Sequence, residues 1–429
     1  METTSSTPAE KSPAEAVIEL EKQYLVQNYA RYPVVLHRGK GCVLYDVNGK
    51  KYLDLVSGIG VNALGHAHPR ILKVLKQQAG LLIHCSNLYY HEYQAPLAKR
   101  LAEITGLQRT FFCNSGAEAV EAGLKMIRAY GRKQRPEKHE IVALEGSFHG
   151  RTMGSVSVTG QTKYRDRFEP LLPGVKFVPR NDVAALEAAV NGNTAGIVME
   201  VIQGEGGVRM AEEAFVRKAR ELADRHNALL LFDEIQCGVG RTGKYCSYQL
   251  FDPPVAPDIV ALAKPLACGL PLGAAVANEK AAVALEKSTH GSTFGGGALA
   301  CRVALEFLDI LEELLPRIYQ LAGYFKVELQ ELSRHYLFIR EIRCYGLMIA
   351  VELEIPAAML VQEALENGLL INAVQEKTIR LLPPYVMSDQ EVDRAIRLLE
   401  KAFKKGREYF VESGLADKLL KEKQGGPQA

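Results

Sequence analysis

Short, uninterrupted runs of apolar residues alternate with segments of helical period through the middle of the chain. The runs lie at 110–113, 141–144, 175–178, 196–201, 228–232, 258–263 and 273–277. Segments such as 117–130 and 212–225 have the period of a helix and separate many of the runs. Apolar runs without polar alternation are typical of strands that are buried on both faces. The pattern therefore predicts an α/β fold with a mainly parallel sheet covered by helices.

The chain has 429 residues, which is more than one hydrophobic core usually serves. We expect a large domain over 70–325 and a smaller α+β domain built from 17–69 and 326–420, with flexible tails at 1–16 and 421–429. In the smaller domain, 41–55 is predicted to be a β-hairpin with Asn48-Gly49 as a type I′ turn. The C-terminal part predicts helices and strands in turn: helices at 298–313, 318–334, 357–367 and 389–404, and strands at 341–351, 369–371 and 378–382.

Composition excludes several classes of protein. Hydrophobic residues make up 47% of the chain and charged residues 24%, as in an ordinary globular protein. The net charge of +2 gives no reason to expect nucleic acid or an acidic membrane surface as a partner. The sequence lacks the long uncharged apolar stretch that a membrane span needs, and its start lacks the apolar core of a signal peptide.

Cysteine and histidine usage points to a reduced compartment and to no metal. The eight cysteines form no C-x-x-C pair, so we expect reduced thiols in a cytoplasmic protein. His66 and His68 have no cysteine or acidic residue close by in sequence, which favours a turn over a metal site.

Two of the apolar runs end in charged residues. Asp233 follows the run at 228–232, and Lys264 follows the run at 258–263. Parallel strands present their carboxyl ends at the edge of a sheet where ligands bind. A lysine that holds pyridoxal phosphate and a carboxylate that protonates its ring fit this arrangement. A structural salt bridge between Lys264 and Asp233 is the alternative interpretation.

Two glycine-containing motifs have more than one interpretation. The residues Asn114 to Ala119 follow one apolar run and open a helix, so their backbone N–H groups are suited to a phosphate. The same spacing also fits a plain helix cap, with Ser115 and Glu118 as a capping box. The segment 238–243 matches G-x-G-x-x-G, but no clear amphipathic helix follows it, so we reject a dinucleotide site there.

Seven motifs in order resemble those of the class III aminotransferases. They are NSGAEA (114–119), SFHGRT (147–152), QGEGG (203–207), DEIQCGVGRTG (233–243), LAK (262–264), HGSTFGG (290–296) and IRLLPP (379–384). The resemblance extends over about residues 20–405. It implies a fold-type I transferase that uses pyridoxal 5′-phosphate and acts as a homodimer with shared active sites.

The resemblance assigns roles to individual positions. Lys264 matches the lysine that binds the cofactor, and Asp233 matches the carboxylate that pairs with the pyridine nitrogen. The other cofactor-binding positions that it implies are Ser115, Gly116, Ala117, Phe148, Glu234, Ile235, Gln236 and Thr293, the last donated by the other subunit. The substrate-binding positions that it implies are Arg151, Ser292, Glu205, Arg380 and Gly58.

The choice of substrate depends on fewer residues. Glu205 and Arg380 resemble an ion pair that opens when glutamate binds. Gly58 stands where ornithine aminotransferases carry a tyrosine, which favours the acetylornithine branch of the family, with 2-oxoglutarate and glutamate as the second substrate pair. A related ω-aminotransferase acting on succinylornithine, ornithine, 4-aminobutyrate or a carrier-linked lysine precursor is one alternative. A non-catalytic protein that keeps the fold is another.

Overall fold

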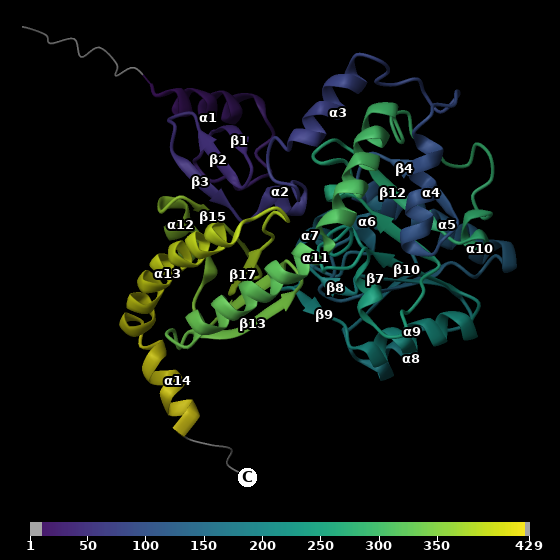
Figure 1. The fold of residues 1–429 in the computed structure, drawn as a ribbon. Coiled ribbons are helices and arrows are strands. Elements are labelled where there is room, and N and C mark those ends of the chain that lie inside the picture. The colour runs from purple at the N-terminus through teal and green to yellow at the C-terminus, as the bar shows by residue number, and fades with distance from the viewer. Residues whose placement is uncertain (1–10, 425–429) are drawn as a thin grey trace, which may run out of the picture.

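The computed structural model describes residues 11–424 and has a seven-stranded sheet at its centre, in the order β4-β12-β11-β10-β7-β5-β6 (Figure 1). Every strand except β12 runs in the same direction. The predicted mainly parallel sheet is confirmed, and each of the seven apolar runs is a strand. The strands are Arg109–Cys113 (β4), Glu140–Leu144 (β5), Val175–Val178 (β6), Thr194–Met199 (β7), Leu229–Asp233 (β10), Ile259–Leu262 (β11) and Gly273–Ala277 (β12).

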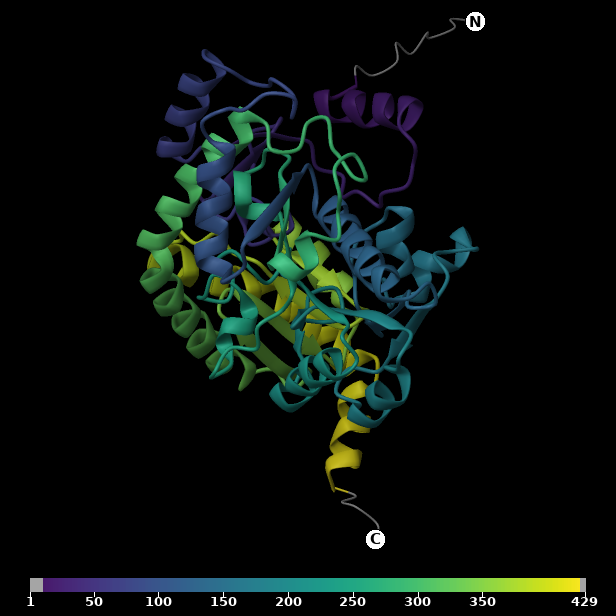
Figure 2. The same ribbon diagram turned by 90° about the vertical axis from the view of Figure 1, so that its right-hand side faces the viewer.

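Helices cover both faces of this sheet (Figure 2). Leu231 and Ile259 point to the face covered by α5, whereas the neighbouring Leu230 and Val260 point to the opposite core, which includes Phe215 of α9. This alternation buries every residue of the central strands, as their apolar sequences require. The helices here are Pro69–Ala79 (α3), Gln94–Thr105 (α4), Gly116–Gln134 (α5), Met153–Ser157 (α6), Thr162–Arg165 (α7), Val183–Ala189 (α8), Glu213–Arg225 (α9) and Glu279–Ala282 (α10).

Segments from both ends of the chain share a small sheet, β1-β2-β3-β15. Strand β15 pairs in parallel with β3, although more than 300 residues of sequence separate them. Figure 1 shows the N-terminal strands, in purple, beside α12 and α13 near the C-terminus. The elements are Leu36–Lys40 (β1), Val43–Asp46 (β2), Lys51–Asp54 (β3), Ser57–Gly60 (α2), Leu369–Leu370 (β15), Ala357–Glu366 (α12) and Asp389–Glu412 (α13).

A second four-stranded sheet, β13-β14-β17-β16, lies below this small sheet in Figure 1, on the same side of the large sheet. A two-stranded hairpin, β8-β9, leads to it from the large sheet. The strands are Ile339–Tyr345 (β13), Met348–Leu353 (β14), Asn372–Val374 (β16), Thr378–Leu381 (β17), Ile202–Gln203 (β8) and Arg209–Met210 (β9).

The hairpin between β2 and β3 does not have the predicted type I′ turn. That turn needs positive φ at both Asn48 and Gly49, but only Gly49 has it, at 84°. The Gly49 N–H donates to the Asp46 carbonyl, and one Asp46 carboxylate oxygen accepts from the N–H groups of Asn48 and Lys50. Asp46 thus fixes a longer loop in which glycine takes the left-handed position.

Two further predictions at the C-terminal end were wrong. The helices expected at 298–313 and 318–334 form one helix, Ala298–Ser333 (α11), with Pro316 inside it. Buried residues before and after the proline, including Leu311 and Ile318, keep both halves against the core. The strand expected at 341–351 is the hairpin of β13 and β14, which turns at Gly346, where φ is 60°.

Both chain ends are more helical than predicted. Helix α1 (Pro13–Tyr24) starts within the expected N-terminal tail, with Ser12 as its cap. Helix α14 (Leu415–Gln424) continues past Lys421. The rest of both expected tails, 1–10 and 425–429, lies outside the described residues. Within 11–424, no helix is both long and apolar enough to cross a bilayer.

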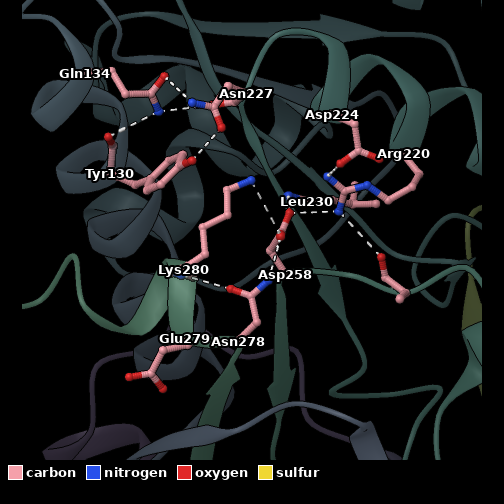
Figure 3. Close-up of polar contacts among 12 residues, drawn as sticks. Tyr130, Gln134, Arg220, Asp224, Asn227, Leu230, Asp258, Asn278, Glu279 and Lys280 are labelled. Carbon is pink, nitrogen blue, oxygen red and sulfur yellow. Dashed lines mark hydrogen bonds and ion pairs between the residues drawn. The ribbon is translucent and has the colours of Figure 1, made fainter.

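A buried carboxylate ties together the amino-terminal ends of the central strands (Figure 3). Asp258 precedes β11 and accepts hydrogen bonds from the Leu230 N–H at 2.8 Å and from Asn278 Nδ2 at 2.7 Å. It also pairs with Arg220 of α9 at 2.8 Å. These contacts fix the sheet at the edge opposite to the carboxyl ends of β10 and β11.

Candidate active site

A cavity of about 490 Å³ lies at the carboxyl ends of β7, β10 and β11. Asp233 ends β10, and Lys264 follows β11 in a short turn with φ of 43°, a left-handed conformation that is rare for a residue with a side chain. Both residues line the cavity. The other predicted site residues that line it are Ser115, Gly116, Ala117, Phe148, Arg151, Ile235 and Gln236.

Asp233 pairs with a histidine and not with Lys264. Its Oδ2 atom lies 2.8 Å from His149 Nδ1, and its Oδ1 accepts from the Ile235 N–H at 3.0 Å. Burial lowers the pKa of His149, but the hydrogen bond to Asp233 and the charges of Asp233 and Glu200 outweigh it, so the net pKa is raised. Within residues 11–424, Lys264 makes no salt bridge shorter than 4 Å. The salt-bridge interpretation of Lys264 and Asp233 is therefore wrong.

Lys264 lies in surroundings that favour its neutral amine. Burial lowers the pKa of its ammonium group, and the positive charge of Arg380 acts in the same direction. The carboxylates of Asp233 and Glu205 oppose this effect without cancelling it. A lysine with a lowered pKa can accept a proton or attack a carbonyl carbon near neutral pH.

The first turn of α5 forms one wall of the cavity. Ser115 caps the helix by accepting from the Glu118 N–H at 3.2 Å, so the cap interpretation of this motif is correct as far as the serine is concerned. The Glu118 carboxylate accepts from the N–H of Asn114 rather than from that of Ser115. A Cβ on Gly116 would lie 2.7 Å from Ile235 Cδ1, so only glycine lets the helix start this close to the residue after β10. A cap and an anion site are compatible here because the Ser115 side chain accepts from the Glu118 N–H, while Gly116 and Ala117 of the same turn line the cavity.

Arg380 and Glu205 form the expected ion pair. Arg380 Nη1 lies 2.5 Å from Glu205 Oε1 and 2.9 Å from Gln236 Oε1, which links β17 to the cavity wall. Arg380 is 1% exposed. Burial raises the pKa of Glu205, but the charge and the hydrogen bond of Arg380 lower it by more, so the carboxylate stays ionised.

Comparison with known proteins identifies the family. The model of the family "Aminotransferase class-III" matches residues 24–403. The chain is a class III aminotransferase. It is 46% identical over 389 residues to the acetylornithine aminotransferase of Methanocaldococcus jannaschii, covering 90% of this chain and 97% of the relative. It is also 46% identical over 379 residues to that of Aquifex aeolicus, covering 88% and 99%.

Solved structures with the same fold include two kinds of aminotransferase. The ornithine aminotransferase of Toxoplasma gondii ME49 superposes with a TM-score of 0.88 at 34% identity, covering 93% of this chain and 97% of that one. The acetylornithine aminotransferase of Elizabethkingia anophelis superposes with a TM-score of 0.81 at 32% identity, covering 92% and 100%. Another structure of the Toxoplasma enzyme has partial occupancy of PLP at its active site.

The cavity of this aminotransferase has features that suit such a cofactor. The Nε2 atom of His149 is buried without a hydrogen-bond partner among the described residues. Gly116 leaves the start of α5 free of a side chain, and no carboxylate of residues 11–424 forms a salt bridge with Lys264. A group with a phosphate and a pyridine ring would find both the first turn of α5 and Asp233 in the lining of this cavity.

Six predicted residues do not line the cavity. Glu205 and Arg380 form the ion pair described above, and the other four have different surroundings. Glu234 is fully buried, and its carboxylate accepts from the Ser247 hydroxyl at 2.6 Å and from the Ser247 N–H. Gly58 lines a separate cavity of about 640 Å³ and has φ of 61°, so the backbone itself favours glycine there. Ser292 Oγ accepts from Asn114 Nδ2 at 3.2 Å, and Thr293 is exposed.

Sequence reasoning missed three residues of the site. His149 lies within the SFHGRT motif beside Phe148, and nothing in its spacing marks it. Tyr164 packs under Arg151, whose guanidinium carbon lies 4.3 Å from the centre of the ring. Glu200 directly follows β7, just as Asp233 ends β10, so the same signal was present. It was overlooked because the apolar run was extended through it to Val201.

Proposed function

We propose that this aminotransferase moves the ω-amino group of N2-acetylornithine to 2-oxoglutarate, giving N-acetylglutamate 5-semialdehyde and glutamate. The observation that carries the proposal is the 46% identity to acetylornithine aminotransferases along nearly their whole length. The residues that line the cavity provide the chemistry that such a reaction needs.

Pyridoxal 5′-phosphate, when bound, supplies a ring that delocalises the negative charge left when a proton leaves the aminated carbon. Lys264 would bind this cofactor, and its Nζ, once displaced by substrate, would move that proton as base and then as acid. Asp233, held by His149, would keep the ring nitrogen protonated. Ser115, Gly116 and Ala117 would hold the phosphate.

Arg380 would select between the two substrates. While it is paired with Glu205, its guanidinium is unavailable, and the cavity accepts an amine with no carboxylate next to the reacting carbon. When glutamate binds, the pair would open, and the planar guanidinium would bind the α-carboxylate at two points. Arg151, at the cavity wall, would bind the other carboxylate.

A comparison of amino donors tests the substrate. The enzyme is given 2-oxoglutarate and, in turn, N2-acetylornithine, ornithine and 4-aminobutyrate, and kcat/KM is measured for each. The proposal requires the highest value with N2-acetylornithine. Ornithine is the second candidate, since the Toxoplasma ornithine aminotransferase superposes with a TM-score of 0.88. The variant Lys264→Ala serves as the control without transamination.

We also propose that the enzyme acts as a homodimer in the cytoplasm. The segment around 81–90 exposes Leu81, Ile83, Leu88, Tyr89 and Tyr90, and Phe294 is exposed beside Thr293. Asn87 donates to the carbonyls of Ser292 and Gly295, so these apolar side chains lie near the Thr293 loop. Exposed apolar patches of this kind mark interfaces. All eight cysteines are free, which fits a reducing compartment.

A further inference from the structure

Arg241, in the glycine-rich segment 238–243, is a buried arginine outside the cavity. It is 1% exposed. Its Nη1 donates to the carbonyl of Pro383 at 2.6 Å and to that of Leu347 at 3.2 Å. Its guanidinium carbon lies 4.6 Å from the centre of the Tyr385 ring. Its Nη2 is buried and has no hydrogen-bond partner among the described residues.

The positive charge of Arg241 has no acidic partner. Within residues 11–424, no carboxylate lies within 4 Å of its guanidinium, whereas the buried Arg343 pairs with Glu341 and Glu352. Two neutral carbonyls accept from Nη1 and an aromatic ring packs on the guanidinium, and none of these contacts cancels the charge. Arginine stays protonated in proteins, so this charge persists in the folded enzyme.

The charge of Arg241 lies beside Gly60, the residue that precedes Val61 in the cavity wall. Arg241 Nη2 is 3.8 Å from the position that a Cβ on Gly60 would occupy, and the next residue, Val61, lines the cavity. Pro383, which accepts its hydrogen bond, is three residues after Arg380. Buried charges act over longer distances than exposed ones, because little water screens them.

We propose that Arg241 is a specificity-determining residue whose charge favours the dianionic substrate. This inference depends on the proposed function. 2-Oxoglutarate carries two negative charges, whereas N2-acetylornithine carries one carboxylate and one ammonium and is neutral overall. A fixed positive potential at the cavity wall therefore strengthens the binding of 2-oxoglutarate and has little effect on the amino donor.

Two variants separate the charge of Arg241 from its hydrogen bonds. Arg241→Met removes both, and Arg241→Lys keeps the charge but loses the planar fork that reaches two carbonyls. We expect Arg241→Met to raise the KM for 2-oxoglutarate by about tenfold and to change that for N2-acetylornithine by less than about twofold. Arg241→Lys is expected to keep both KM values within about threefold of the wild type. Arg334→Met, which removes an exposed arginine paired with Glu331, is the control and should change neither.

Other outcomes would overturn the proposal. If Arg241→Met raises both KM values equally, or if Arg241→Lys loses as much affinity for 2-oxoglutarate as Arg241→Met, the residue only stabilises structure. If Arg241→Met fails to fold, Arg241→Lys decides alone, and a tenfold loss for 2-oxoglutarate in a variant with unchanged melting temperature rejects the charge effect. Failure of the proposed function is a separate result, because the wild type would then not use these two substrates at all.

Discussion

Burial of charged groups sets the properties of the site at the scale of single residues. Glu200 accepts hydrogen bonds from the N–H groups of Phe148 and Gly204. Its negative charge also helps to raise the pKa of His149. Burial raises the pKa of its carboxyl from 4.5 to about 7, although the charge of His149 and these hydrogen bonds lower it. Glu200 is thus close to a change of charge near neutral pH.

Replacement of this carboxyl should change how stability depends on pH. Because the pKa of Glu200 is higher in the folded protein than in the unfolded chain, the folded state loses stability as pH rises through 7. Glutamine does not titrate, so Glu200→Gln does not lose stability in this way as pH rises. Melting temperatures of the cofactor-free wild type and variant, measured from pH 5 to 8, should therefore diverge in favour of the variant. Parallel curves would contradict this expectation.

The place of a residue in the site was predictable where its side chain follows an apolar run, as for Asp233 and Lys264. The fixed spacing from the strand to the sheet edge gave their position. His149 was not predictable, because its role depends on a contact with a residue 84 positions away. The positive φ of Gly58 was equally hidden, because glycine in a loop fits both a strained backbone and an empty pocket.

At the scale of elements, close packing decides what each helix tolerates. Gly131 lies in the last turn of α5, where an added Cβ would be 2.3 Å from the Lys138 carbonyl and 2.6 Å from Ala195 Cβ. Gly323 lies in α11, where an added Cβ would meet nothing within 4 Å. Both glycines are helical, and only their neighbours differ.

These two glycines should respond in opposite ways to the same substitution. Gly131→Ala is expected to lower the free energy of unfolding by about 1–3 kcal/mol, because backbone atoms must move. Gly323→Ala should raise it by about 0.5–1 kcal/mol, because alanine favours helix and has room. Denaturant unfolding of both variants checks this, and a loss in Gly323→Ala would show that α11 is packed more tightly than described.

Asp258 joins β10 to α9 and should contribute more to the stability of the fold than an exposed acidic residue does. Asp258→Ala leaves Arg220 without its buried partner and the Leu230 N–H without an acceptor, so we expect a loss of about 3 kcal/mol. Glu279→Ala removes an exposed pair with Arg109 and should leave the melting temperature unchanged. Equal effects of the two variants would argue against a joining role for Asp258.

Helices and strands could be told apart from the sequence where a single pattern was strong. Uninterrupted apolar runs identified all seven strands of the large sheet. The errors arose where tertiary contacts override local preference: Pro316 is tolerated inside α11 because apolar residues before and after it are buried. The hairpin at Gly346 was missed because the predicted strand was continued through this single glycine, although its backbone turns there with φ of 60°.

At the scale of the whole molecule, the proposed dimer makes each site depend on two chains. If Thr293 serves the partner's site, a mixed dimer of Lys264→Ala and Thr293→Ala contains one site with both native residues. Random mixing of the two inactive variants should then restore about a quarter of the wild-type activity, because half of the dimers are mixed and each has one intact site. Absence of recovery, with mixed dimers confirmed by two different tags, would show that Thr293 acts within its own chain.

The pairing of β15 with β3 has a consequence for how this protein is made. Leu53 and Leu55 donate their N–H groups to Gly368 and Leu370, which the ribosome adds more than 300 residues later. Until then the edge of β3 is an open template for other chains. Completion of the first sheet therefore waits for almost the last part of synthesis, and the unpaired edge is exposed to other chains during that time.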